Sequence, residues 1–202
     1  MGKRETEDKI VQAAVEEFIE RGVDGARMRA ISDRAEVNKG LIHYYFKTKD
    51  VLIARVVDAI VGVLINRLND AIEGEEDIFE IIRTFTAVYI DTVQRKPGIP
   101  RFVLTELGKN PERMMRLLDR TKKAEMVKTF ERALSRAVEK DEVVDISANQ
   151  LFANILSMCV FPFVGRPMIQ LSMGMRNEDF EDFIEKRKTG VADFVIRAIK
   201  KH

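Results

Sequence analysis

Apolar residues recur every three or four positions along most of the chain, a spacing that places them on one face of an α-helix. The first such segment covers residues 6–21, with Thr6 as its expected cap and Gly22 at its end. A longer segment covers residues 49–72, and Thr48 is its expected cap. The sequence contains no strand-like alternation and no internal repeat, so the pattern predicts an all-α fold.

Proline and glycine divide the second half of the chain into further segments of the same kind. Helices are expected over residues 77–96, 101–108, 111–140 and 147–161, and from residue 177 onward. The segment 168–175 is apolar without a clear period, so it is predicted to be a half-buried loop. With the two short helices of residues 27–46, the sequence predicts about nine helices.

Residues 27–50 are predicted to form two short helices around a tight turn. Their apolar sets are Met28, Ile31 and Ala35, then Leu41, Ile42, Tyr45 and Phe46. Asn38 is a good cap for the second helix, because its side-chain oxygen can accept from a backbone amide one turn on. The exposed face of that helix then consists of Lys39, Gly40, His43 and Tyr44. A short helix that presents a cation, an imidazole and a phenol suits the major groove of DNA.

The sequence from residue 35 to residue 49, AEVNKGLIHYYFKTK, resembles the helix-turn-helix signature of the tetracycline-repressor (TetR) family. The resemblance extends from about Lys9 to Leu52. Two positions depart from the family pattern, since Glu36 occupies a turn position that is often glycine, and Arg27-Met28 replaces the usual Ser or Thr cap. The resemblance implies a DNA-binding domain over residues 1–50 and an effector-binding and dimerisation domain over residues 51–202.

The same resemblance implies roles for individual side chains in the DNA-binding domain. Base contacts fall on Arg29, Lys39, Gly40, Leu41, His43 and Tyr44, and phosphate contacts on Tyr45 and Lys49. A physical reason exists for Gly40, because a residue without a side chain lets the backbone approach the bases closely. Lys47 and Lys49 flank a helix start, where backbone amides and the helix dipole also favour a phosphate. For Leu41, the alternative is a place in the core.

The larger domain is expected to enclose a pocket for an apolar or amphipathic effector. Its candidate residues are Phe85, Tyr89, Arg101, Phe102, Met114, Met115, Leu118, Thr121, Met158 and Phe161. Taken singly, most of them can equally be core residues. The resemblance also implies a two-fold interface made by the last two helices. The candidates there are Phe152, Ile155, Leu156, Cys159, Phe180, Phe183, Ile184, Arg187 and Val191, with an intramolecular core as the alternative.

Charge and cysteine content narrow the class of protein. The formal net charge of +1 implies no general affinity for polyanions, but residues 27–49 contain six basic and two acidic residues. One cysteine, Cys159, excludes an internal disulfide and is expected in the core of a cytoplasmic protein. The first residues have no signal-peptide pattern, and no run of about 18 apolar residues suggests a membrane span.

Catalysis has little support in the sequence. The two histidines, His43 and His202, provide no triad or metal cluster, and no glycine-rich phosphate loop occurs. We therefore expect no cofactor and no enzyme. The sequence predicts a TetR-type regulator, most simply a ligand-responsive repressor, that binds a palindromic operator in double-stranded DNA as a homodimer with heads about 34–36 Å apart. The alternative is a helical small-molecule-binding or scaffold protein whose helix-turn-helix does not bind DNA.

Overall fold

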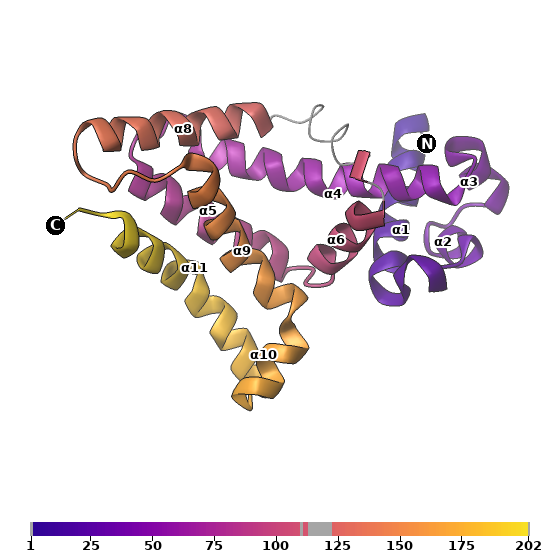
Figure 1. Ribbon diagram of the computed structural model, residues 1–202. Helices are drawn as coiled ribbons and strands as arrows, with labels where there is room; N and C mark the ends of the chain where they lie inside the picture. The colour runs from indigo at the N-terminus through magenta and orange to yellow at the C-terminus, as the bar shows by residue number, and fades with distance from the viewer. Residues whose placement is uncertain (1, 110, 113–122, 202) are drawn as a thin grey trace. The chain divides into compact units, whose positions relative to one another are not determined.

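The computed structural model describes residues 2–109, 111–112 and 123–201, and these residues form ten helices (Figure 1). The helices are α1 (Lys3–Gly25), α2 (Met28–Arg34), α3 (Lys39–Phe46), α4 (Lys49–Ile72), α5 (Ile78–Gln94), α6 (Ile99–Lys109), α8 (Lys123–Glu139), α9 (Ala148–Val164), α10 (Arg166–Met173) and α11 (Asn177–Ile199). Within the described residues the only strand-like pairing is an isolated bridge between Val143 and Lys200. The all-α prediction is confirmed.

Local capping explains several helix boundaries. Thr48 Oγ1 accepts from Val51 N at 3.3 Å at the start of α4, and Asp77 Oδ1 accepts from Phe79 N at 2.8 Å at the start of α5. Thr6 is not a cap, which corrects the prediction. The first helix begins earlier because Glu5 Oε2 accepts from the Gly2 amide at 3.4 Å and closes a turn ahead of Thr6.

The predicted loop at residues 168–175 is wrong, because Arg166–Met173 forms the helix α10. Pro167 lies in its first turn, where a proline costs no hydrogen bond, and Gly174 ends it with a φ of +64°. No residue of α10 is buried. Its apolar residues therefore do not follow the helical spacing that a buried face produces. Most of the predicted helix 111–140 coincides with α8, and its residues 113–122 lie outside the described residues.

By contacts between Cα atoms the chain divides into two compact units. The first contains the described residues of Met1–Val63 and Arg101–Leu117. Its core is built from α1, α2, α3, the first half of α4 and α6. The ring of Phe18 in α1 stacks on Phe102 of α6, with ring centroids 5.7 Å apart. This contact unit is larger than the predicted DNA-binding domain of residues 1–50, whose functional boundary stays a prediction.

The second unit contains the described residues of Leu64–Pro100 and Leu118–His202. In its core α5 packs along α11, and α8 and α9 contribute Phe130 and Phe152, whose rings lie edge to face with centroids 5.9 Å apart. Phe85 of α5 also contacts Phe152, at a centroid distance of 5.6 Å. Interlocked aromatic rings of this kind bury a large apolar area, so this cluster is a main source of the unit's stability.

Five of the predicted two-fold interface residues lie in this core. Ile155, Cys159, Phe180, Ile184 and Val191 are 0 to 3 % exposed in the single chain. Their own chain already covers these side chains, which favours the intramolecular alternative, and the two-fold interface stays a prediction. Phe194 of α11, by contrast, is 63 % exposed.

A proline inside α9 creates an unusual contact with α11. In an uninterrupted helix the Met158 carbonyl would accept from the amide of residue 162, but Pro162 has no N–H. Arg187 Nη2 donates to that carbonyl at 2.7 Å instead. The guanidinium also lies over the Phe183 ring, 5.4 Å from its centroid, and burial lowers the pKa of Arg187. Arg187 thus ties α11 to the proline-interrupted part of α9.

A helix that crosses a membrane needs about 20 consecutive, largely apolar residues. Within the described ranges no single helix is long and apolar enough to cross a membrane. The helices α9 and α10 reach the required length and hydropathy only when they are taken together, and the chain bends by 78° between them.

Candidate nucleic-acid interface

The helix α3 is fixed at its start by a cap and along one side by the core of the first unit. Asn38 Oδ1 accepts from Leu41 N at 2.8 Å, which confirms the predicted cap. Ile42 and Phe46 are 0 and 3 % exposed, so they seat the helix against its neighbours. Leu41 and Tyr45 are half-buried at the edge of that contact. The helix is therefore held rigidly while its opposite face is left to solvent.

The exposed face of α3 carries the residues predicted to read DNA. Lys39, Gly40, His43 and Tyr44 are all exposed, and the Tyr44 side chain is 66 % exposed. The Tyr44 ring meets Tyr45 edge to face, with centroids 5.4 Å apart, which orients it. A Cβ at Gly40 would lie 3.2 Å from the capping oxygen of Asn38, so a side chain there would crowd the cap. The sequence prediction had only the approach of the backbone to the bases as a reason for this glycine.

The turn between α2 and α3 explains one departure from the TetR pattern. Glu36 has a φ of +55°, in the left-handed region that glycine adopts without strain. Its amide donates to Asp33 O at 3.3 Å, and Val37 N donates to Ser32 O at 3.0 Å. The backbone therefore adopts the left-handed conformation at this position although a Cβ is present, and the conformation of Glu36 is strained.

The start of α2 has no side-chain cap of its own, but a buried carboxylate from α1 replaces it. Glu17 is 1 % exposed, and its Oε1 accepts from Arg27 N at 3.4 Å. The same carboxylate lies 3.5 Å from Arg21 and 3.7 Å from Arg34. A negative charge at a helix N-terminus is stabilising. The sequence prediction missed Glu17, although an acid beside Phe18 on the apolar face of the first helix was a signal for it.

The positive charge of this region is partly used inside the unit. Arg34 pairs with Glu16 at 3.0 Å and with Glu20 at 2.8 Å. These hydrogen bonds, first that with Glu20 and then that with Glu16, raise the pKa of Arg34, and the Arg34 guanidinium lowers the pKa of Glu20. Arg34 therefore joins α1 to α2, and its charge is largely neutralised there. The candidate surface is less positive than the residue count suggests.

The remaining predicted contacts differ in how exposed their charges are. Arg29 is exposed and lies 4.0 Å from the exposed Asp33, a distance at which the pairing is weak. Lys47 is exposed, and a positive φ of +58° marks it as the end of α3. Lys49 is half-buried, and its Nζ donates to Ala26 O at 2.7 Å. The Lys49 ammonium thus also holds the start of α4 against the loop before α2.

Two family models match the sequence. The model for bacterial regulatory proteins of the tetR family matches residues 10–56. The model for the tetracycline repressor-like C-terminal domain matches residues 79–195, which is more than half of the chain. The chain belongs to the TetR family.

Individual relatives agree with this assignment. A transcriptional repressor of Mycobacterium tuberculosis is 39 % identical over 79 residues, 39 % of this TetR-family chain and 41 % of the relative. The repressor NicS of Pseudomonas putida is 40 % identical over 55 residues, 27 % of this chain and 26 % of that protein. The chain thus spans about two fifths or less of the length of these relatives.

Solved structures of the TetR family share the fold over nearly the whole chain. A regulatory protein from Rhodococcus superposes with a TM-score of 0.75 at 15 % identity and covers all of both chains. The regulator PfmR from Thermus thermophilus superposes with a TM-score of 0.70 at 16 % identity over 93 % of this chain and 97 % of that one. At these identities the likeness shows the fold alone.

The residues predicted for an effector pocket are distributed over both units. Phe85 and Tyr89 are buried in the second unit, where their rings stack with centroids 6.0 Å apart, whereas Phe102 belongs to the core of the first. Phe161 is 49 % exposed and Met158 half-buried. Arg101 is exposed. The other four, Met114, Met115, Leu118 and Thr121, lie outside the described residues. The pocket stays a prediction for this TetR-family chain.

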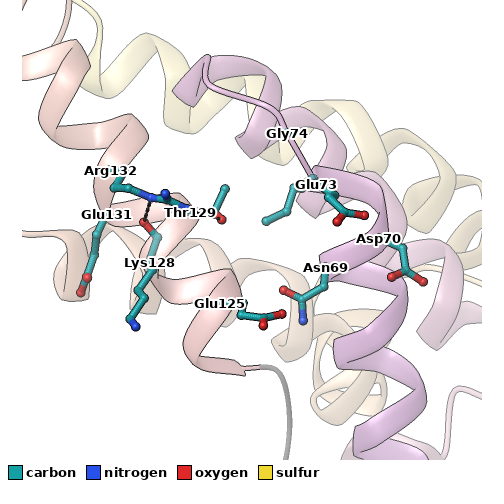
Figure 2. Close-up of a pocket in the computed structure, with 10 residues that line it drawn as sticks. Asn69, Asp70, Glu73, Gly74, Glu125, Lys128, Thr129, Glu131 and Arg132 are labelled. Atoms are coloured by element: carbon teal, nitrogen blue, oxygen red, sulfur yellow. Dashed lines mark hydrogen bonds between the residues drawn. The ribbon is translucent and has the colours of Figure 1, made fainter.

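Two hollows among the described residues have a different character. One, of about 560 Å³, lies between the end of α4 and α8 (Figure 2). Its lining is Asn69, Asp70, Ile72, Glu73, Gly74, Glu125, Lys128, Thr129, Glu131 and Arg132. The other, of about 700 Å³, is lined by residues of α1, α2 and α4 together with Ala35 and Glu36. Neither is lined by a predicted pocket residue, and the charged lining of the first suits no apolar effector.

Cys159 behaves as a core residue. It is 0 % exposed, and burial raises the pKa of its thiol to about 12. A thiol that stays protonated at neutral pH is a poor nucleophile. The prediction that Cys159 belongs to the core is therefore confirmed.

Proposed function

We propose that this chain is a transcriptional regulator that binds a palindromic operator in double-stranded DNA as a homodimer and responds to a small apolar or amphipathic effector. The exposed face of α3 is the observation that carries the proposal. It presents Lys39, His43 and Tyr44 on a helix whose start is capped and whose other side is buried. A short rigid helix of this kind fits the major groove, where base edges are distinguishable.

The exposed side chains divide into base-reading and phosphate-binding groups. Lys39 and His43 donate to base acceptors, Tyr44 contacts a thymine methyl, and Arg29 reaches a guanine edge. Gly40 allows the backbone to approach, and Leu41 contributes only its exposed edge. Tyr45, Lys47 and Lys49 bind phosphates around the start of α4. Lys49 retains donors for a phosphate after its bond to Ala26 O, because an ammonium has three.

Homodimerisation follows from how little one α3 can read. A single helix contacts only a few base pairs, whereas two heads about 34–36 Å apart face successive major grooves. Of the predicted interface residues, Phe152, Leu156, Phe183 and Arg187 retain some exposed surface. We assign the two-fold contact to the outward faces of α9 and α11, where Phe161 and Phe194 are exposed.

Repression is the mode supported by the names of the two relatives, both of which are repressors. In the proposed mechanism an effector binds one arrangement of the two heads more tightly than another, and that arrangement does not fit the operator. Such a ligand shifts the equilibrium only by its difference in affinity for the two states.

The proposal is tested by fluorescence anisotropy with labelled DNA from the regions that flank the gene. The wild type is expected to prefer one duplex over random DNA, and Lys39→Ala and Tyr44→Ala each to weaken that binding by about 5- to 150-fold, equivalent to roughly 1–3 kcal/mol. Lys140→Ala, which removes an exposed lysine of the second unit, is the matched control and should have no effect. If the wild type bound every duplex equally at low salt, the alternative of a helical ligand-binding or scaffold protein would be favoured.

A further inference from the structure

The surface of α9 and α10 is nearly free of charge. Between Asp145 and Arg176 the only charged residue is Arg166, in a chain whose residues are 33 % charged. At that average, thirty residues would hold about ten charges. Burial accounts for one side of α9 only. Its other side is exposed and carries Ala153, Asn154, Ser157 and Phe161.

The helix α10 continues this uncharged surface with large apolar side chains. Met168, Leu171 and Met173 are 56, 86 and 63 % exposed. Ten large hydrophobic residues are exposed in the described part of the chain, and these three together with Phe161 and Phe194 make up half of them. Met168 and Leu171 are three positions apart, so they share one face of α10. Large apolar side chains exposed on neighbouring positions are typical of an interaction site.

Contacts within the same chain fix α10 in place, so its apolar face does not fold back onto its own chain. Arg166, its first residue, pairs with Glu181 at 3.1 Å and donates to Asn177 Oδ1 at 3.2 Å. Its guanidinium also lies 4.4 Å from the centroid of the buried Phe180 ring. These contacts join α10 to the start of α11. The apolar face is thus presented outward on a fixed helix.

The patch adjoins the face that we assign to dimerisation. At the junction of α9 and α10, the Phe161 ring lies so close to Gly165 that a Cβ there would be 2.9 Å from it. Phe161 therefore borders both helices. Phe161 and Phe194 alone, at 49 and 63 % exposed, offer on the order of 200 Å² of ring surface. A stable interface buries about 800 Å² per partner, so the two rings supply only part of that area, and the half-buried residues of α9 and α11 and the adjoining face of α10 are the neighbouring surfaces that can supply more.

We propose that the Met168/Leu171 face of α10 is buried against a second copy of this chain and extends the two-fold contact of α9 and α11. The inference rests on the proposed homodimer. A second copy is the fitting occupant because a two-fold contact places the same uncharged surface on both partners and needs no second kind of surface. A charged partner would leave its charges unpaired against α10.

The test measures self-association of the full chain by sedimentation equilibrium. Leu171→Lys places a charge in the proposed contact and is expected to raise the dimer Kd at least tenfold. Val63→Lys is the matched control, because Val63 is a 59 % exposed apolar residue of α4, and it should leave the Kd unchanged. Phe194→Lys probes the α9/α11 face separately. Operator binding by Leu171→Lys should recover at high protein concentration, since only assembly is impaired.

The outcomes separate the two proposals. An increased Kd for both Leu171→Lys and Phe194→Lys supports the extended interface. An increase for Phe194→Lys alone overturns the role of α10 and leaves the homodimer intact, whereas a wild type that is monomeric at all concentrations overturns both. Should Leu171→Lys fail to fold, hydrogen exchange of wild-type residues 166–175 decides. Slower exchange at higher protein concentration supports burial of α10 in the dimer, and unchanged exchange overturns it.

Discussion

The contact between Arg187 and the Met158 carbonyl can be isolated by a double-mutant cycle with Pro162. In the wild type the carbonyl depends on Arg187 Nη2, at 2.7 Å, because Pro162 has no amide hydrogen. Pro162→Ala restores a backbone donor one turn on. Arg187→Met is therefore expected to be costly when residue 162 is proline and much less costly when it is alanine.

The magnitude follows from the kind of hydrogen bond. A bond from a charged donor contributes about 1.5–3 kcal/mol, and a buried carbonyl left without a donor costs a similar amount. Because Arg187 is only partly buried, we take about 2 kcal/mol for Arg187→Met in the wild-type background. In the Pro162→Ala background about 0.5 kcal/mol should remain, from the loss of packing over Phe183. The expected coupling free energy is then about 1.5 kcal/mol.

Urea unfolding followed by circular dichroism measures the free energy of unfolding for the four proteins. All samples need the same protein concentration, because association stabilises the folded state in a concentration-dependent way. The contact of Arg187 with Phe183 is lost in both backgrounds and cancels in the cycle. If Arg187→Met cost the same with alanine at residue 162 as with proline, the carbonyl would not be the partner that matters, and the reasoning would be refuted.

Three further outcomes are expected. Glu36→Gly should raise the free energy of unfolding by about 0.5–1 kcal/mol in urea titration, because relief of the positive φ outweighs the greater freedom of glycine in the unfolded chain, and a loss would contradict the strain. Glu17→Gln should lower it by about 1–3 kcal/mol, whereas equal stability would show that the carboxylate charge does not hold Arg27 and Arg34. Cys159 should resist iodoacetamide in the folded protein at pH 8, and rapid labelling without unfolding would contradict its burial. The pKa of its thiol in the folded protein, about 12, exceeds the ordinary 9.0. The contribution of the protonated thiol to stability is therefore present below pH 9 and lost as the pH rises towards 12.

Local rules predicted the elements that local interactions determine. Asn38 and Thr48 cap helices as expected, because capping involves one side chain and an amide three residues away. The exposed face of α3 was also predictable, since the buried positions Ile42 and Phe46 fix its opposite side. The amphipathic pattern of this short helix and its cap residue were enough to predict which side chains of α3 are exposed.

Interactions between distant residues were not predictable in the same way. The spacing that marks Ile184 and Val191 as apolar does not say whether the same chain or a second copy covers them. Glu17 was missed because two of its partners, Arg27 and Arg34, lie just before α2 and within α2. Arg34 was counted among the basic residues of 27–49 because its acidic partners come from α1. The helix α10 was missed because helical periodicity records burial within one chain, and none of its residues is buried there.

The cap of α3 also limits how the family can diversify at this surface. The oxygen that holds the helix start lies 3.2 Å from where a Cβ on residue 40 would be. To admit a side chain at residue 40, the Asn38 oxygen would have to shift by a few tenths of an ångström, so a change there affects the cap as well as the proposed groove contact. The side chains of Lys39, His43 and Tyr44 take no part in that cap, so a lineage that acquires a new operator should vary first at those three positions.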